Sequence, residues 1–87
     1  MEIGSRLEEV LAAAAQCGVQ VRRAGLGGEG GGWCEIKGQR VLFVDTMADL
    51  ETSFARAVEA LAGVDGIDEV YLRPEIREAI DRYRQPG

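Results

Sequence analysis

A run of glycine interrupts this chain near its middle. Residues 25–32 read Gly-Leu-Gly-Gly-Glu-Gly-Gly-Gly. Glycine loses more backbone entropy on folding than any other residue, so a helix or a central strand would be costly here. The segment therefore predicts a loop or a wide connection between two strands, with the ordered elements on either side of it.

Length and composition restrict the class of protein. The chain has 87 residues, of which 46% are hydrophobic and 29% charged, as is typical of one small globular domain. We expect this single domain to cover residues 1–84, with residues 85–87 as a flexible end. Ten basic and fifteen acidic residues give a net charge of -5, which disfavours binding to nucleic acid and to anionic membranes. The expected partner is a second copy of the chain or another protein.

The chain contains no histidine, and this excludes more chemistry than any other feature. Without an imidazole there is no Ser-His or Cys-His nucleophile pair and no histidine metal ligand. The two cysteines lack the spacing of a zinc site, and no stretch reads as a signal peptide or a membrane span. We expect no catalytic residue, no metal and no cofactor, in a cytoplasmic protein whose cysteines stay reduced.

Three segments carry apolar residues at three- and four-residue spacing, which predicts amphipathic helices. The first covers residues 3–17, and the second has its apolar stripe at residues 50–61. The third begins at Pro74, where the missing N–H of proline is harmless, and buries residues as far as Tyr83.

Three further segments read as strands before the last helix. Alternating patterns predict strands at residues 19–23 and 33–37, and the unbroken apolar run at residues 41–44 predicts a central strand covered on both faces. Gly38 and Gln39 suit a type II′ turn that joins the second and third strands in a hairpin.

The apolar run at residues 67–72, after the second helix, predicts a fourth strand parallel to the third. The expected order is therefore α-β-β-β-α-β-α. This order describes a single α+β domain with a mixed, mostly antiparallel four-stranded sheet and helices packed on it.

The glycine run contains a literal G-x-G-x-x-G pattern that could hold a phosphate or a nucleotide on backbone N–H groups. The contacts would come from Gly27, Gly28 and Gly30, with Lys37 and Asp45 completing the site. A dinucleotide fingerprint needs a helix after the glycines, whereas a strand is predicted here. A flexible hairpin loop is the alternative interpretation.

Asp45 ends the apolar run at the carboxyl end of a predicted strand, where α/β proteins place catalytic or metal-binding carboxylates. Asp49 and Glu51 follow closely, so a Mg²⁺ site is one interpretation. The other is that Asp45, Thr46 and Asp49 form the turn and the cap before the second helix.

Apolar side chains on the predicted sheet form a candidate interaction surface. Alternation separates Trp33 from Cys34, and an exposed indole beside Leu42, Val44 and Tyr71 would mark a partner surface. A helix covering that face is the alternative. Cys34 is a candidate reactive thiol, although its place in the alternation also fits a buried, inert one.

Three stretches together resemble a known group of proteins. They are Gly-Gly-Trp-Cys-Glu-Ile-Lys-Gly at residues 31–38, Val-Leu-Phe-Val-Asp at residues 41–45 and Val-Tyr-Leu-Arg-Pro-Glu at residues 70–75. The chain resembles short bacterial proteins that carry Gly-Gly-x-Cys-x-x-Lys-Gly and have no known function. The resemblance implies a bacterial, stand-alone domain and no particular activity.

The predicted helices are too few to cover both faces of the predicted sheet. We therefore expect a non-catalytic module for protein–protein interaction or oligomerisation, forming a homodimer through sheet surface. The alternative is a small-ligand domain that binds phosphate or a nucleotide with residues 25–32 and Asp45.

Overall fold

The computed structural model describes residues 2–84, and the three predicted helices are confirmed there. Helix α1 covers Ile3–Gln16, α2 covers Leu50–Ala62 and α3 covers Pro74–Arg84. The flexible end expected at residues 85–87 lies outside the described residues.

Two capping arrangements set where α1 ends and α2 begins. After α1, Gly18 takes a positive φ of 82°, and the N–H of Val19 donates to the carbonyl of Ala14 at 3.0 Å. This closes the helix in the way that glycine permits and sends the chain into the sheet. Asp49 precedes α2 and accepts a hydrogen bond from the N–H of Thr52 at 2.7 Å. The predicted cap of the second helix is therefore present.

The sheet has three strands, β1 (Gln20–Ala24), β2 (Gly31–Ile36) and β3 (Gln39–Asp45), in the order β1-β3-β2. The third strand is central, as its unbroken apolar run predicts. β2 pairs with it antiparallel and β1 pairs with it parallel, so the sheet is mixed. Both outer strands come before the central one in the chain, and the loop at residues 25–30 joins them.

The hairpin between β2 and β3 turns one residue earlier than expected. Lys37 and Gly38 both have positive φ, 50° and 80°, and Ile36 pairs with Gln39 directly across the turn. Positive φ at both central residues defines a type I′ turn, which matches the twist of the flanking strands. The expected type II′ turn at Gly38 and Gln39 is therefore wrong.

The predicted fourth strand at residues 67–72 is also wrong, and the sheet has three strands rather than four. Ile67–Glu69 forms a short 3-10 helix, η1, and the chain then continues without strand pairing to α3. The guanidinium of Arg77 in α3 donates to the carbonyls of Ile67 and Val70 at 3.2 and 2.8 Å. A side chain thus satisfies backbone groups that a neighbouring strand would otherwise bond. The α+β class remains.

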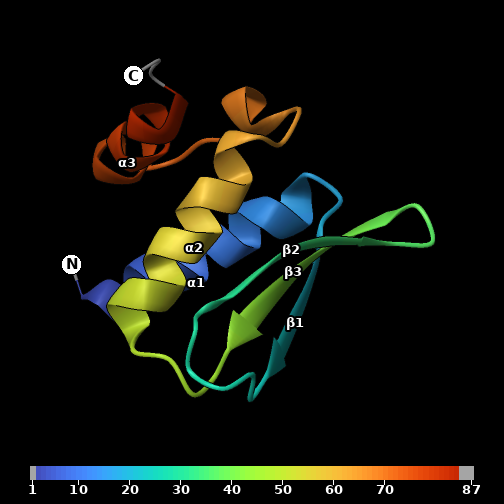
Figure 1. Ribbon diagram of the computed structural model, residues 1–87. Helices are drawn as coiled ribbons and strands as arrows, with labels where there is room; N and C mark the ends of the chain where they lie inside the picture. The colour runs from blue at the N-terminus through green and yellow to red at the C-terminus, as the bar shows by residue number, and fades with distance from the viewer. Residues whose placement is uncertain (1, 85–87) are drawn as a thin grey trace.

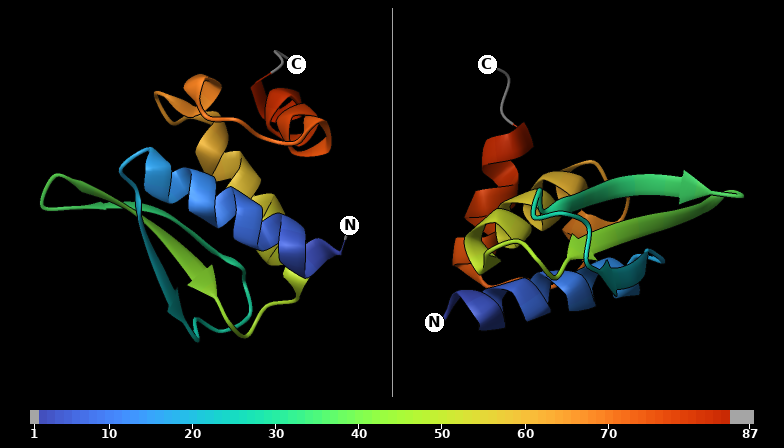
Figure 2. Two further views of the ribbon diagram at one scale, coloured as in Figure 1. Left: turned by 180° about the vertical axis from the view of Figure 1, so that it is seen from behind. Right: turned by 60° about the horizontal axis from the view of Figure 1, so that its bottom comes forward.

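The helices lie on one side of the sheet. Figures 1 and 2 show α1 and α2 side by side between the sheet and α3, which is the helix farthest from the strands. One continuous core fills the space between these layers. Its buried members come from all three helices, from β3, from Val19 before β1 and from the segment after α2. The largest include Leu42, Leu61, Ile67, Ile76 and Ile80.

The two faces of β3 have different surroundings. Leu42 and Val44 belong to the core under the helices, so the alternation of a strand directs Val41 and Phe43 to the opposite face. Val41 is fully buried on that face, whereas Phe43 remains half-buried. No helix of the described chain covers this second face (Figure 1).

Candidate functional site

The carboxylate of Asp45 organises the glycine loop. Its Oδ1 accepts hydrogen bonds from the N–H groups of Leu26 and Met47, both at 2.9 Å. Its Oδ2 accepts from the N–H groups of Gly28 at 2.6 Å and Gly30 at 3.2 Å. Asp45 is only 1% exposed, so these four backbone donors replace water around the charge. The carboxylate therefore connects two segments at this end of the sheet, the turn after β3 and the loop before β2.

The loop needs glycine for two separate reasons. Gly27, Gly28 and Gly30 have φ values of 94°, 92° and 100°, in a region that other residues rarely adopt. At Gly31, with φ of 85°, a Cβ would overlap the carbonyl oxygen of Phe43 on the neighbouring strand. The positive φ values of Gly27, Gly28 and Gly30 let the loop turn its backbone N–H groups towards Asp45. Gly31 lets β2 begin directly against β3.

The environment of Asp45 favours its charged form. Burial alone would raise the pKa of this carboxyl, but the backbone hydrogen bonds from Leu26, Met47, Gly30 and Gly28 outweigh that cost. They lower the pKa of Asp45 from its ordinary 3.8 to about 2. The residue therefore remains an anion that holds the loop at all physiological pH values.

This geometry determines what the glycine loop can bind. The N–H groups of Leu26, Gly28 and Gly30 could cradle an external anion only if they released Asp45, which already occupies that position as an internal anion.

Lys37 lies at the hairpin turn, at the opposite end of the seven-residue strand β3 from Asp45. At about 3.3 Å per residue that separation is roughly 20 Å. The structure does not bring Lys37 to the loop.

The carboxylates near the start of α2 do not form a cation site. Among residues 2–84, no three Cys, Asp or Glu side chains are grouped as a metal ion would require. The carboxylate of Asp49 accepts from Thr52, which lowers its pKa, and Asp45 accepts from the loop amides. Both acids perform the turn and capping roles that the sequence offered as the alternative to Mg²⁺.

The four residues of the predicted interaction surface are dispersed. Leu42 and Val44 are buried under the helices of their own chain. Tyr71 is 82% exposed but lies with Glu9, Arg73 and Pro74, away from the sheet. Only Trp33, which is 42% exposed and paired opposite Leu42, stays on an accessible part of the sheet.

Trp33 lies between two hollows that flank strand β2. One, of about 370 Å³, lies around the backbone of Gly31 and Gly32 and is lined by Leu26, Glu29, Trp33, Cys34 and Phe43. The other, of about 310 Å³, lies between β2 and α2 and is lined by Arg56, Glu59, Ala60 and Gly63 together with Trp33 and the same two glycines. β2 is therefore open on both of its faces.

Leu26, Trp33, Cys34 and Phe43, which line the first of these hollows, together make up the β2 surface. Leu26 is 43% exposed, and Cys34 and Phe43 are half-buried. Sequence reasoning missed Leu26 and Phe43. The pairing of Phe43 with Gly32 and of Cys34 with Val41 puts these side chains on one face, but the sequence alone does not show that register.

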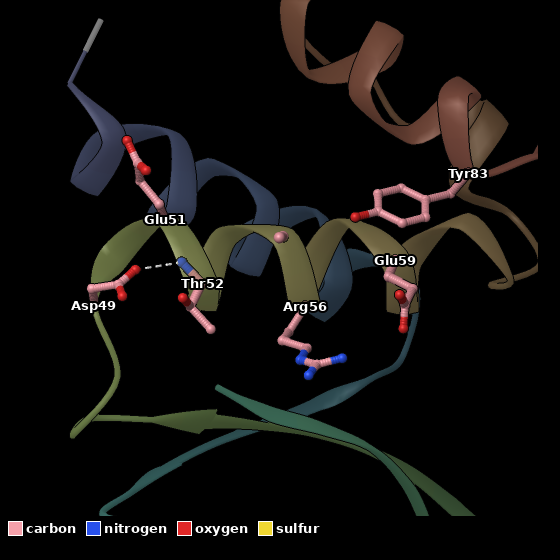
Figure 3. Close-up of a pocket in the computed structure, with 7 residues that line it drawn as sticks. Asp49, Glu51, Thr52, Arg56, Glu59 and Tyr83 are labelled. Atoms are coloured by element: carbon pink, nitrogen blue, oxygen red, sulfur yellow. Dashed lines mark hydrogen bonds between the residues drawn. The ribbon is translucent and has the colours of Figure 1, made fainter. Parts of the chain in front are cut away.

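A third hollow, of about 430 Å³, lies along α2 (Figure 3). Tyr83 reaches over it from α3, and Asp49 and Glu51 lie at one end. Tyr83 is half exposed here, which corrects its expected burial. Arg56 and Glu59 point from α2 towards the strands, so both belong to the β2 side of the helix as well.

The two cysteines are free thiols, both half-buried. The Sγ of Cys34 lies 3.8 Å from the carbonyl oxygen of Glu35, a weak contact. Cys34 as a reactive thiol stays a prediction. No helix of the described residues is long and apolar enough to cross a bilayer.

Comparisons of this chain with protein-family models, with curated proteins and with solved structures found no match.

Proposed function

We propose that this protein is a non-catalytic interaction module that forms a homodimer through its β2 surface. The observation that carries the proposal is the position of Trp33. This residue is 42% exposed on an edge strand, and a hollow that is apolar except for Glu29 opens beside it. Aromatic side chains at the centre of an apolar surface contribute much of the binding energy of protein interfaces.

The arrangement of the layers supports the same proposal. All the helices lie on one side of the sheet, so no element of the described chain covers Cys34 and Phe43. A chain of 87 residues has a thin core and gains stability when a second molecule buries apolar surface. The proposed setting is the bacterial cytoplasm, where Cys34 stays reduced.

The alternative, a phosphate or nucleotide site at residues 25–32, lacks comparable support. Such a site would use the backbone N–H groups of Gly28 and Gly30, and these already donate to Asp45. A ligand would have to displace a buried carboxylate that is held as an anion.

Sedimentation equilibrium at micromolar concentration tests the homodimer. We expect a mass of twice the 9.4 kDa chain, and a Trp33→Ser variant that sediments as a monomer. Tyr71→Ser is the matched control, because Tyr71 is 82% exposed and lies outside the β2 surface. A monomeric parent chain, or equal association of the two variants, would contradict the proposal.

A further inference from the structure

The two edges of the sheet differ in how well they are protected. The outer edge of β1 carries Arg22 and Arg23, and Arg23 forms a two-point ion pair with Glu8 of α1 at 2.8 Å for both contacts. Charged side chains of this kind discourage the addition of another strand. β2 begins instead with Gly31 and Gly32, which carry no side chain of their own to hinder a neighbouring strand. It is the edge that can accept a strand.

The hairpin fixes which backbone groups of β2 are available. In a two-residue I′ hairpin the residues that flank the turn bond each other, so Ile36 bonds to Gln39, and alternate residues then point their N–H and C=O groups across to β3. Among the intervening residues, Trp33 and Glu35 direct theirs outward, whereas Gly31 has a φ of 85° and does not continue the extended pattern. Within residues 2–84 no strand pairs with this edge.

We propose that β2 pairs antiparallel with β2 of a second copy, with Trp33 opposite Trp33 and Gly31 opposite Glu35. The proposal rests on the homodimer proposed above and specifies its geometry. It joins the two three-stranded sheets into one six-stranded sheet around a two-fold axis, and the outward backbone groups of Trp33 and Glu35 bond to β2 of the other copy.

Side-chain size along β2 is complementary to itself in this orientation. The strand begins with two glycines and continues with Trp33, Cys34 and Glu35. Antiparallel pairing places the glycine half of each copy against the large half of the other. The hollows on both faces of Gly31 and Gly32 then receive Glu35 on the helix side and Cys34 on the open side.

Charge supports the same register. Arg56 extends from α2 over the start of β2, where a Cβ on Gly30 would lie 2.9 Å from its Cγ. Its guanidinium makes one contact, from Nε to the carbonyl oxygen of Glu29 at 3.4 Å, and no ion pair with a described carboxylate. Glu35 of the second copy, opposite Gly31 on the same face, lies within reach of this arginine. Registers closer to the hairpin turn put Glu35 opposite its own copy or opposite Trp33, where no glycine leaves room for it.

A charge-swap cycle tests this contact between copies. We expect Glu35→Arg and Arg56→Glu each to weaken dimerisation by at least about fivefold, and the double variant to recover to within about twofold of the parent chain. Glu59 lines the same hollow in every variant, so its contribution to the free energy of dimerisation cancels when the coupling between positions 35 and 56 is calculated. Two additive losses without recovery would overturn the register.

Amide hydrogen exchange of the unmodified chain tests the backbone pairing without any substitution. The amides of Gly32 and Cys34 bond within the hairpin and should exchange slowly at every protein concentration. Those of Trp33 and Glu35 should become slow only above the dissociation constant measured by sedimentation. If the chain dimerises while the Trp33 and Glu35 amides still exchange fast, the edge pairing is wrong and the interaction module stands. If the chain is monomeric, both proposals fail.

Discussion

The close approach of β2 to β3 at Gly31 predicts a large and specific cost for adding one methyl group. In Gly31→Ala the new Cβ overlaps the carbonyl oxygen of Phe43 and lies 2.8 Å from its carbon. Phe43 is in the central strand, which is held on both sides, so β2 has to move away. Gly27→Ala is the matched control, because Gly27 also has a positive φ, 94°, but has open space around its Cβ.

The two variants share the backbone cost and differ in the overlap. Placing alanine at positive φ costs about 1–2 kcal/mol of unfolding free energy, and this is the only destabilising effect expected at Gly27. The overlap at Gly31 adds about 1–3 kcal/mol. The gain from a stiffer unfolded chain is equal in both variants and cancels. For a domain of this size each kcal/mol lowers the melting temperature by about 4–8 °C.

Urea unfolding followed by far-ultraviolet circular dichroism measures both free energies. A single low protein concentration, at which the chain is monomeric, keeps association from contributing. We expect Gly31→Ala to be less stable than Gly27→Ala by about 1–3 kcal/mol with similar urea dependence. Equal stabilities would show that Gly31 does not lie against the Phe43 carbonyl, and the description of this end of the sheet would fail.

Two other predictions concern buried polar contacts. The folded pKa of Asp45, about 2, lies below its ordinary 3.8, so the stability it contributes is complete above about pH 4 and is lost as the pH falls towards 2. Asp45→Asn should lack this loss of stability at low pH, and the urea midpoint of each protein measured as a function of pH would show the difference. Parallel pH profiles of the parent chain and the variant would contradict the prediction. Arg77→Met removes the donors to the Ile67 and Val70 carbonyls and should cost about 2–3 kcal/mol by thermal unfolding. An unchanged melting temperature would mean that these carbonyls find other donors.

The helices could be predicted because their evidence is local. Apolar residues at three- and four-residue spacing are visible within each segment. The capping residue Asp49 lies only three residues before Thr52, whose N–H donates to it. The central position of β3 was predictable for a related reason. The unbroken apolar run at residues 41–44 indicated a central strand, but the cover that it predicted on both faces is wrong, because the helices lie on one face and leave Phe43 half-buried on the other.

The errors concern interactions between distant residues. Residues 67–72 have the apolar character of a strand. However, the carbonyl of Ile67 accepts its hydrogen bond from the guanidinium of Arg77, ten residues later. The parallel pairing of β1 with β3 depends on a partner about 20 residues away, beyond the glycine loop. No local pattern contains either contact.

The candidate site divides in the same way. The turn role of Asp45 was visible from its position at the end of the strand, and the hydrogen bond that it accepts from the N–H of Met47 confirms it. Its bonds to Leu26, Gly28 and Gly30 span 15 to 19 residues and could not be derived from the sequence. Alternation correctly separated Trp33 from Cys34, but it does not show which face the helices cover, so Leu42 and Val44 were expected at the surface.

Fluorescence of Trp33 across a dilution series tests the homodimer most directly, because this residue is the single tryptophan of the chain. The indole is 42% exposed in one copy and becomes covered when two β2 strands meet. The emission maximum should move to shorter wavelength as concentration rises, with its midpoint at the dissociation constant found by sedimentation. An emission maximum that stays constant from nanomolar to high micromolar protein would contradict self-association through this surface.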